Sequence, residues 1–200
     1  MIPLKGRFAT VLVALALTLG LGAPAAAEVE AHKVDKSHSR IGFKAYTSLF
    51  DVDGRFKRWS AKAFFDPADL TKSKITLTVD TQSVDTDSEG RDKHLRKEDF
   101  FYVQKFPKAR FVSTSFAKEG DNFSVTGDLT IRGVTKRVTV PFKWSETKRL
   151  TKKKGGVEYL SRRAKGTITV NRKDYNINYK AGLLLPSVKD DVDVTFDVNF

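Results

Sequence analysis

The residues of this chain that could do chemistry gather in one charged, helix-prone stretch, residues 88–107. Arg91, Asp92 and His94 fall there within one helical turn, where they could contact the polar head group of a ligand. The same side chains could instead dock the helix on the rest of the fold, because a carboxylate near a helix N-terminus is favoured whatever the protein does. We expect docking to be the main role and keep head-group contact as the alternative, with His38 as a further candidate for either role.

The sequence lacks the patterns of common catalytic and metal sites. His38 and His94 are far apart, and neither belongs to a His-x-x-x-His pair, which argues against a zinc site. Ser37 and Ser39 flank His38 outside any Gly-x-Ser-x-Gly elbow, and no glycine-rich phosphate loop follows. The sequence therefore predicts a protein that is not an enzyme and that uses neither a metal nor another cofactor.

The first 27 residues have the features of a cleaved secretory signal peptide. Lys5 and Arg7 precede an apolar run over residues 8–21, and the alanines at 25–27 offer a small-residue cleavage site. The run is short and broken by glycine, whereas a membrane-spanning helix needs about 20 apolar residues. We expect cleavage after about Ala27, export to the periplasm, and a single mature domain over residues 28–200.

Composition limits the possible partners of such an exported chain. It contains no cysteine, so its stability must come from packing rather than from disulfides. The formal net charge is +12, which favours anionic partners. Outside the cytoplasm these are membrane surfaces, lipid phosphates or acidic glycans more readily than nucleic acid.

Part of this positive charge is concentrated between two predicted strands. The basic residues could belong to a solvated hairpin tip, which is the simpler interpretation. They could also bind an anionic membrane surface, where each Lys or Arg contributes about 1 kcal/mol. The candidates for this surface are Lys152, Lys153, Lys154, Arg162 and Arg163.

Alternation of apolar and polar residues marks most of the mature chain as half-buried β-strands. Ile41, Phe43 and Ala45 alternate with polar neighbours, the period expected when one face of a strand meets a core. Turn signals such as Arg132-Gly133 separate the strands. The pattern predicts an antiparallel meander closed into a barrel or sandwich, with one short helical insertion. Similar alternation covers residues 75–79, 122–131, 137–144, 168–170 and 192–200.

Two local signals predict interruptions of this pattern. Asp53-Gly54 has the composition of a turn. Pro141 lies inside an alternating run, and because proline lacks a backbone donor we expect an edge or a bulge there.

Seven short motifs, in their order and spacing, resemble those of the YceI-like family of bacterial lipid-binding barrels. No single motif would suffice, but together they cover nearly the whole mature chain. The motifs contain Val34, Asp35, His38 and Ser39; Gly54 to Phe56; Arg91, Asp92, His94 and Leu95; Asp99 to Phe101; Lys105 to Pro107; Val125 to Lys136; and Arg172 to Tyr175.

The resemblance implies an all-β fold with one short helical insertion: an extended, lipocalin-like antiparallel β-barrel that encloses an apolar cavity. Its members bind long apolar chains, such as polyisoprenoids or fatty-acid derivatives, inside the barrel. Alternation alone leaves this open, since a barrel of about eight strands can be filled by side chains or hold one ligand. The residues predicted to face inward and contact the ligand are Phe43, Phe56, Leu77, Val79, Phe111, Phe123, Val125, Leu129, Trp144 and Ile168.

We therefore predict an extracytoplasmic protein that sequesters or carries a lipid or isoprenoid chain. One alternative is a small outer-membrane barrel, which the alternating C-terminus ending in Phe200 would suit but the helical insertion would not. Another is a structural or stress-related periplasmic protein without a lipid ligand. The sequence leaves the oligomeric state open, with a homodimer among the alternatives.

Overall fold

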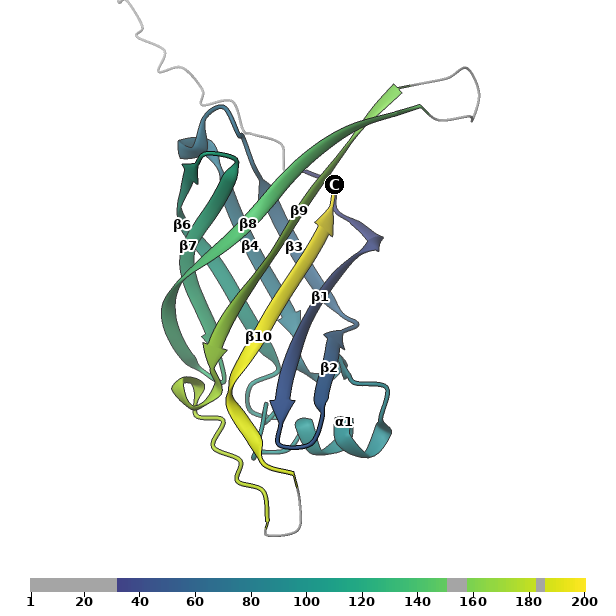
Figure 1. Ribbon diagram of the computed structural model, residues 1–200, viewed down its shortest axis with the longest axis vertical. Coiled ribbons are helices and arrows are strands. Elements are labelled where there is room, and N and C mark those ends of the chain that lie inside the picture. The colour runs from purple at the N-terminus through teal and green to yellow at the C-terminus, as the bar shows by residue number, and fades with distance from the viewer. Residues whose placement is uncertain (1–31, 151–157, 183–185) are drawn as a thin grey trace, which may run out of the picture.

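One antiparallel sheet contains all ten strands of the computed structural model, which describes residues 32–150, 158–182 and 186–200 (Figure 1). The strand order in the sheet is β3-β4-β6-β7-β8-β9-β10-β1-β2-β5. The strands are β1 (Asp35–Thr47), β2 (Asp51–Phe56), β3 (Trp59–Phe64), β4 (Lys74–Asp80), β5 (Val84–Asp85), β6 (Lys108–Glu119), β7 (Asn122–Ile131), β8 (Val134–Leu150), β9 (Glu158–Asn171) and β10 (Val188–Asn199).

The sheet closes on itself because two of its strands are bent. β2 continues into β3 after two residues, and β4 continues into β5 through a short 3-10 turn. β3 pairs with β4 along its whole length, and the end of β2 pairs with β5, so the two bent strands lie side by side. Across the bend, the amides of Lys57 and Arg58 donate to the carbonyl and hydroxyl oxygens of Ser83 at 3.0 and 2.9 Å. β2 with β3, and β4 with β5, each form one bent strand. Because β1 pairs with both β2 and β10, the sheet closes into a ring, and the predicted antiparallel barrel is confirmed.

The predicted helical insertion is also confirmed, although it is short. α1 spans Glu89–Leu95 and lies across one end of the barrel (Figure 1), which we call the α1 end. Ser88 occupies the N-cap position without a side-chain capping bond. The chain then turns back, with the amide of Phe101 donating to the carbonyl oxygen of Leu95 at 3.0 Å. Within the described ranges, no helix is long and apolar enough to span a membrane. The 3-10 helices are η1 (Leu70–Lys72), η2 (Thr81–Ser83) and η3 (Arg172–Tyr175).

The turn predicted at Asp53-Gly54 is wrong, since both residues lie inside β2. Gly54 is the register partner of Phe43 on β1. A Cβ atom at position 54 would lie 2.2 Å from the tip of the Phe43 ring. The glycine therefore leaves room for an aromatic ring on the neighbouring strand, a tertiary requirement that a dipeptide cannot reveal.

Pro141 makes β8 an edge on one of its two sides. β8 pairs with β7 along residues 134–142, but its pairing with β9 begins only at Phe142. Beyond Gly166, β9 pairs with β10 alone. We call the unpaired boundary between β8 residues 134–141 and β9 residues 167–171 the seam.

Aromatic side chains fill the end of the barrel opposite α1, which we call the aromatic end. The Phe65 ring lies 4.6 Å from Trp144, 5.2 Å from Phe123 and 5.4 Å from Phe142, measured between ring centroids. Phe65, Phe123 and Phe142 are buried. This cluster closes the interior at the aromatic end, so any hollow must lie between it and α1.

Candidate ligand cavity

Apolar side chains line two adjoining hollows inside the barrel, which together we call the cavity. The volume open to the centres of water molecules is about 150 Å³ in the hollow nearer α1 and about 110 Å³ in the second hollow. Each could hold on the order of ten waters, yet the walls are almost entirely aliphatic and aromatic. Such a space suits an apolar molecule better than water. The residues that line both hollows are Ile41, Leu77, Phe111, Leu129 and Val194.

Eight of the ten residues predicted to face inward line this cavity. Phe123 and Trp144 pack in the aromatic end instead, where the Phe123 ring stacks on Phe142 at 5.7 Å. As ligand contacts, all ten remain predictions. The eight lining residues are Phe43, Phe56, Leu77, Val79, Phe111, Val125, Leu129 and Ile168.

Several cavity residues come from segments without a two-residue period, and sequence reasoning missed them. They lie in the helical insertion and in the chain that follows β9. The only signal was the family resemblance, whose motifs contain Leu95, Phe100, Phe101 and Tyr175, and nothing in the sequence pointed to Ile177 or Val188. The missed residues are Leu95, Phe100, Phe101, Tyr175, Ile177 and Val188.

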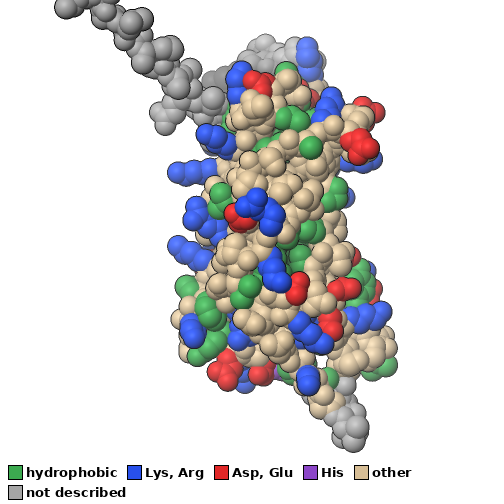
Figure 2. Space-filling model, turned by 90° about the vertical axis from the view of Figure 1, so that its left-hand side faces the viewer, with side chains coloured by type: hydrophobic (Ala, Val, Ile, Leu, Met, Phe, Trp, Pro, Cys, Tyr) green, Lys and Arg blue, Asp and Glu red, His purple; other side chains and the backbone are tan. Residues whose placement is uncertain are grey.

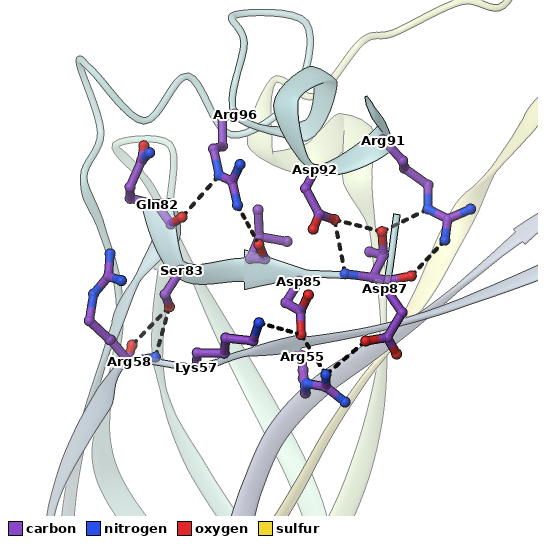
Figure 3. Close-up of polar contacts among 12 residues, drawn as sticks. Arg55, Lys57, Arg58, Gln82, Ser83, Asp85, Asp87, Arg91, Asp92 and Arg96 are labelled. Atoms are coloured by element: carbon purple, nitrogen blue, oxygen red, sulfur yellow. Dashed lines mark hydrogen bonds and ion pairs between the residues drawn. The ribbon is translucent and has the colours of Figure 1, made fainter. Parts of the chain in front are cut away.

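Polar contacts around β5 hold α1 over the cavity (Figure 3). Asp92 is buried, and its Oδ1 accepts hydrogen bonds from the amide and hydroxyl of Thr86 at 2.9 and 2.6 Å. Arg91 donates to the hydroxyl and carbonyl oxygens of Thr86 at 2.8 and 2.7 Å. Arg96 donates to the carbonyl oxygen of Val84 at 2.8 Å. These bonds favour the docking role for Arg91 and Asp92.

An ion-pair cluster joins β2 to β5 beneath this helix. Oδ2 of Asp85 lies 3.0 Å from Lys57 Nζ and 2.6 Å from Arg55 Nη2 (Figure 3). Lys57 and Arg55 hold the pKa of Asp85 below its ordinary value, although burial of the carboxylate acts in the opposite direction. Asp87 contacts the same guanidinium at 2.8 Å. The short β5 is thereby tied to both the barrel wall and α1.

Arg172 fixes two cavity-lining stretches at the α1 end, one at Ile177 and one at Val188. Its side chain is buried, and it donates to the carbonyl oxygens of Ile177 at 2.7 Å and Lys189 at 3.1 Å. It also pairs with Asp190 at 2.9 Å. Because these partners lie on both sides of residues 178–187, one side chain ties both ends of this segment to the wall.

Comparisons with known proteins agree with this geometry. The profile of the YceI-like domain matches residues 32–200. The chain belongs to the YceI-like family. It is 42% identical over 128 residues to Protein YceI of Salmonella newport, and equally to that of Salmonella arizonae. These matches cover 61% of this chain and 64% of each relative, just under two thirds of their length.

Solved structures share the fold. BcnA of Burkholderia cenocepacia matches with a TM-score of 0.72 at 26% identity, over 84% of this chain and 99% of BcnA. The YceI protein of Campylobacter jejuni matches at 0.62 and 28% identity, over 86% and 98%. A polyisoprenoid binding domain from Saccharophagus degradans matches at 0.59 and 16% identity, over 83% and 95%, a likeness of fold alone.

The two histidines considered as head-group candidates lie at opposite ends of this YceI-like barrel. His38 is exposed near the start of β1, where its Nδ1 contacts Asp35 Oδ2 at 2.7 Å. Hydrogen bonds from Ser37 and His38 lower the pKa of Asp35 to about 2. His94 Nε2 lies 3.3 Å from Asp99 Oδ2 at the α1 end. The described residues contain no group of three or more side chains that could hold a metal ion.

The predicted basic surface is only partly described. Lys152, Lys153 and Lys154 lie outside the described residues, as does the predicted signal peptide. Arg162 pairs with Glu146 at 3.1 Å, and Arg163 donates to Asp197. Asp197 raises the pKa of Arg163. Both arginines therefore have acidic partners on neighbouring strands.

Proposed function

We propose that this protein binds a long apolar chain, isoprenoid or fatty-acid-like, inside its barrel. The observation that carries the proposal is the cavity itself, whose walls are almost entirely apolar. Membership of the YceI-like family supports this assignment. The Saccharophagus degradans neighbour, a polyisoprenoid binding domain with the same fold, supports it further.

Apolar burial can supply the affinity without a polar contact. Each methylene group removed from water contributes about 0.8 kcal/mol, so a dozen carbons would gain roughly 8 to 10 kcal/mol before the costs of association and ordering. The closed aromatic end and the covered α1 end shield the chain from water. Binding therefore depends on the shape and polarity of the wall rather than on a charged pocket.

The same proposal includes export to the periplasm and a role as a carrier or storage protein. The signal-peptide features of residues 1–27 support export to the periplasm. A lined hollow without a cluster of chemically active side chains supports a carrier or storage protein rather than an enzyme. An outer-membrane barrel is less well supported, because Phe123 and Val125 on β7 are buried while charged side chains are spread along the visible outer face (Figure 2).

Native mass spectrometry of protein purified from its own periplasm without detergent tests the proposal. We expect a mass above that of the mature chain and an apolar molecule in the organic extract. Leu77→Ser should reduce the retained ligand, because Leu77 lines both hollows.

Val84→Ser is the matched control. Val84 is 1% exposed and lines neither hollow, so this change should lower stability by about 1–3 kcal/mol and leave retention in the folded fraction unchanged. Equal retention by the parent and Leu77→Ser, or a parent that carries no apolar molecule and binds none on addition, would contradict the proposal.

A further inference from the structure

β8 and β9 are hydrogen-bonded along only one half of their length. Their register runs from Leu150 opposite Glu158 to Phe142 opposite Gly166, and stops there. Toward the α1 end the two strands separate in Figure 1. Each keeps its other neighbour, β7 or β10. The seam is therefore an interruption in the hydrogen-bonded barrel wall.

Pro141 explains where the interruption begins. A Cβ atom on Gly166 would lie 2.4 Å from the carbonyl oxygen of Pro141, so that carbonyl points toward β9. In an antiparallel pair, the N–H and C=O of one residue point to the same neighbouring strand. Proline has no N–H. The missing donor is therefore the one that would have continued the ladder into the seam.

Polar side chains on the β8 side of the seam turn away from it. The Thr139 hydroxyl lies 2.9 Å from that of Thr126, and Arg137 Nε donates to Asp128 Oδ1 at 2.7 Å. Both partners lie on β7. These contacts reinforce the intact β7–β8 ladder and add nothing across the seam.

Polar side chains on the β9 side also bond to their outer neighbour rather than across the seam. The Thr169 hydroxyl donates to Asp193 Oδ1 at 2.6 Å, and the Asn171 side-chain amide donates to Asp191 Oδ1 at 3.2 Å. Both acceptors lie on β10. Each side of the seam is thus fastened to its outer neighbour.

Ion pairs connect β8 to β9 in the paired half of the two strands and to η3 at the far end of the seam. In the paired half, Arg162 and Glu146 are register partners and form an ion pair at 3.1 Å. At the far end of the seam, Lys136 Nζ lies 3.4 Å from Asp174 Oδ1, and both side chains are about half exposed. An exposed pair of this kind contributes little to stability, so it can open easily.

The seam leads directly to the cavity. Val138 and Val140 on β8 line the second hollow, and Ile168 faces it from β9. Val170 of β9 lines the hollow nearer α1. An apolar chain that passed between the two strands would meet apolar wall at once.

We propose that the seam is a side entrance through which a long apolar chain enters and leaves the cavity. β8 and β9 can move apart there without breaking an interstrand ladder, whereas separating two fully paired strands such as β7 and β8 would break one. This inference rests on the proposed function, since it names the route to the same site.

Reversible cross-linking tests the route, because the chain has no cysteine of its own. Continuing the register places Thr139 opposite Thr169, so the variant T139C/T169C can be bridged across the seam with a short bifunctional methanethiosulfonate reagent and released with reductant. The probe is cis-parinaric acid, a fluorescent polyene fatty acid. Its release to excess vesicles should slow on the order of tenfold when the seam is bridged, and recover after reduction.

The control variant is K143C/K165C. These residues are exposed register partners in the paired half of the same strands, so bridging them should leave release unchanged. Equal release from the bridged and unbridged seam, or equal slowing by the control bridge, would overturn the side entrance and leave the proposed function standing. Failure of the unmodified parent to bind cis-parinaric acid or any other apolar chain would overturn both.

Discussion

At the scale of one residue, burial changes the pKa of the Tyr175 phenol. Its ring is 2% exposed and lines the hollow nearer α1. Burial, with a smaller effect of Asp174, raises the pKa of Tyr175 to about 12 from 10.0. The folded protein therefore disfavours the phenolate, and we expect the part of the α1 end around Tyr175 to be sensitive to alkali.

This shift predicts the alkaline limit of stability. The unfolded chain ionises at a lower pH than the folded one, so the contribution of Tyr175 is complete below pH 10 and is lost as pH rises through about 12. Urea unfolding at several pH values should show a shallower alkaline decline for Tyr175→Phe than for the parent. Superimposable pH profiles of the two proteins would refute this role.

At the scale of one element, α1 depends on a buried carboxylate. Asp92→Ala leaves the amide and hydroxyl of Thr86 without their acceptor, so we expect a loss of about 1–3 kcal/mol of stability. Hydrogen exchange should quicken over residues 89–103. Asp92→Asn is the control because it keeps an oxygen acceptor, and it should retain most of the protection. Unchanged exchange in the Ala variant would mean that α1 is held by other contacts.

The seam gives a second prediction at this scale. Pro141→Ala restores a donor that points toward β9, which should protect the amide of residue 141 from exchange and slow ligand release. The new hydrogen bond contributes about 0.5–1.5 kcal/mol, but losing the rigid proline costs about 0.4–1 kcal/mol, so stability should change little.

Pro67→Ala is the matched control for this change. Pro67 is exposed in a loop, so the substitution should lower stability slightly and leave release unaffected. An unprotected amide at residue 141 in Pro141→Ala would show that the seam is kept open by something other than the missing donor.

At the scale of the whole molecule, the basic surface and the apolar cavity should bind their partners independently of each other. Replacing Lys152, Lys153 and Lys154 with Gln should weaken association with anionic vesicles and flatten its salt dependence, because exposed charges act over about 8 Å at physiological salt. Retention of a neutral isoprenoid should stay the same, since apolar burial supplies its affinity. Co-sedimentation at low and high salt measures the difference, and equal binding by variant and parent would leave these lysines as a solvated surface.

The sequence by itself determined most of the strands and much of the cavity wall. A two-residue period states directly which side chains share a face, so the spacing placed Leu77, Leu129 and Ile168 on faces that the structure shows to line the cavity. The motif order also identified the family. These features are local or nearly so, and local pattern is what a sequence displays.

Tertiary structure decided the rest. Gly54 looks like a turn until Phe43 is placed across from it, and Phe101 reaches the cavity only because Asp92 docks α1 on β5. The break at Pro141 became a seam because its carbonyl faces β9 rather than β7. Each of these depends on which strand lies beside which, and that pairing is set by packing between residues far apart in the chain.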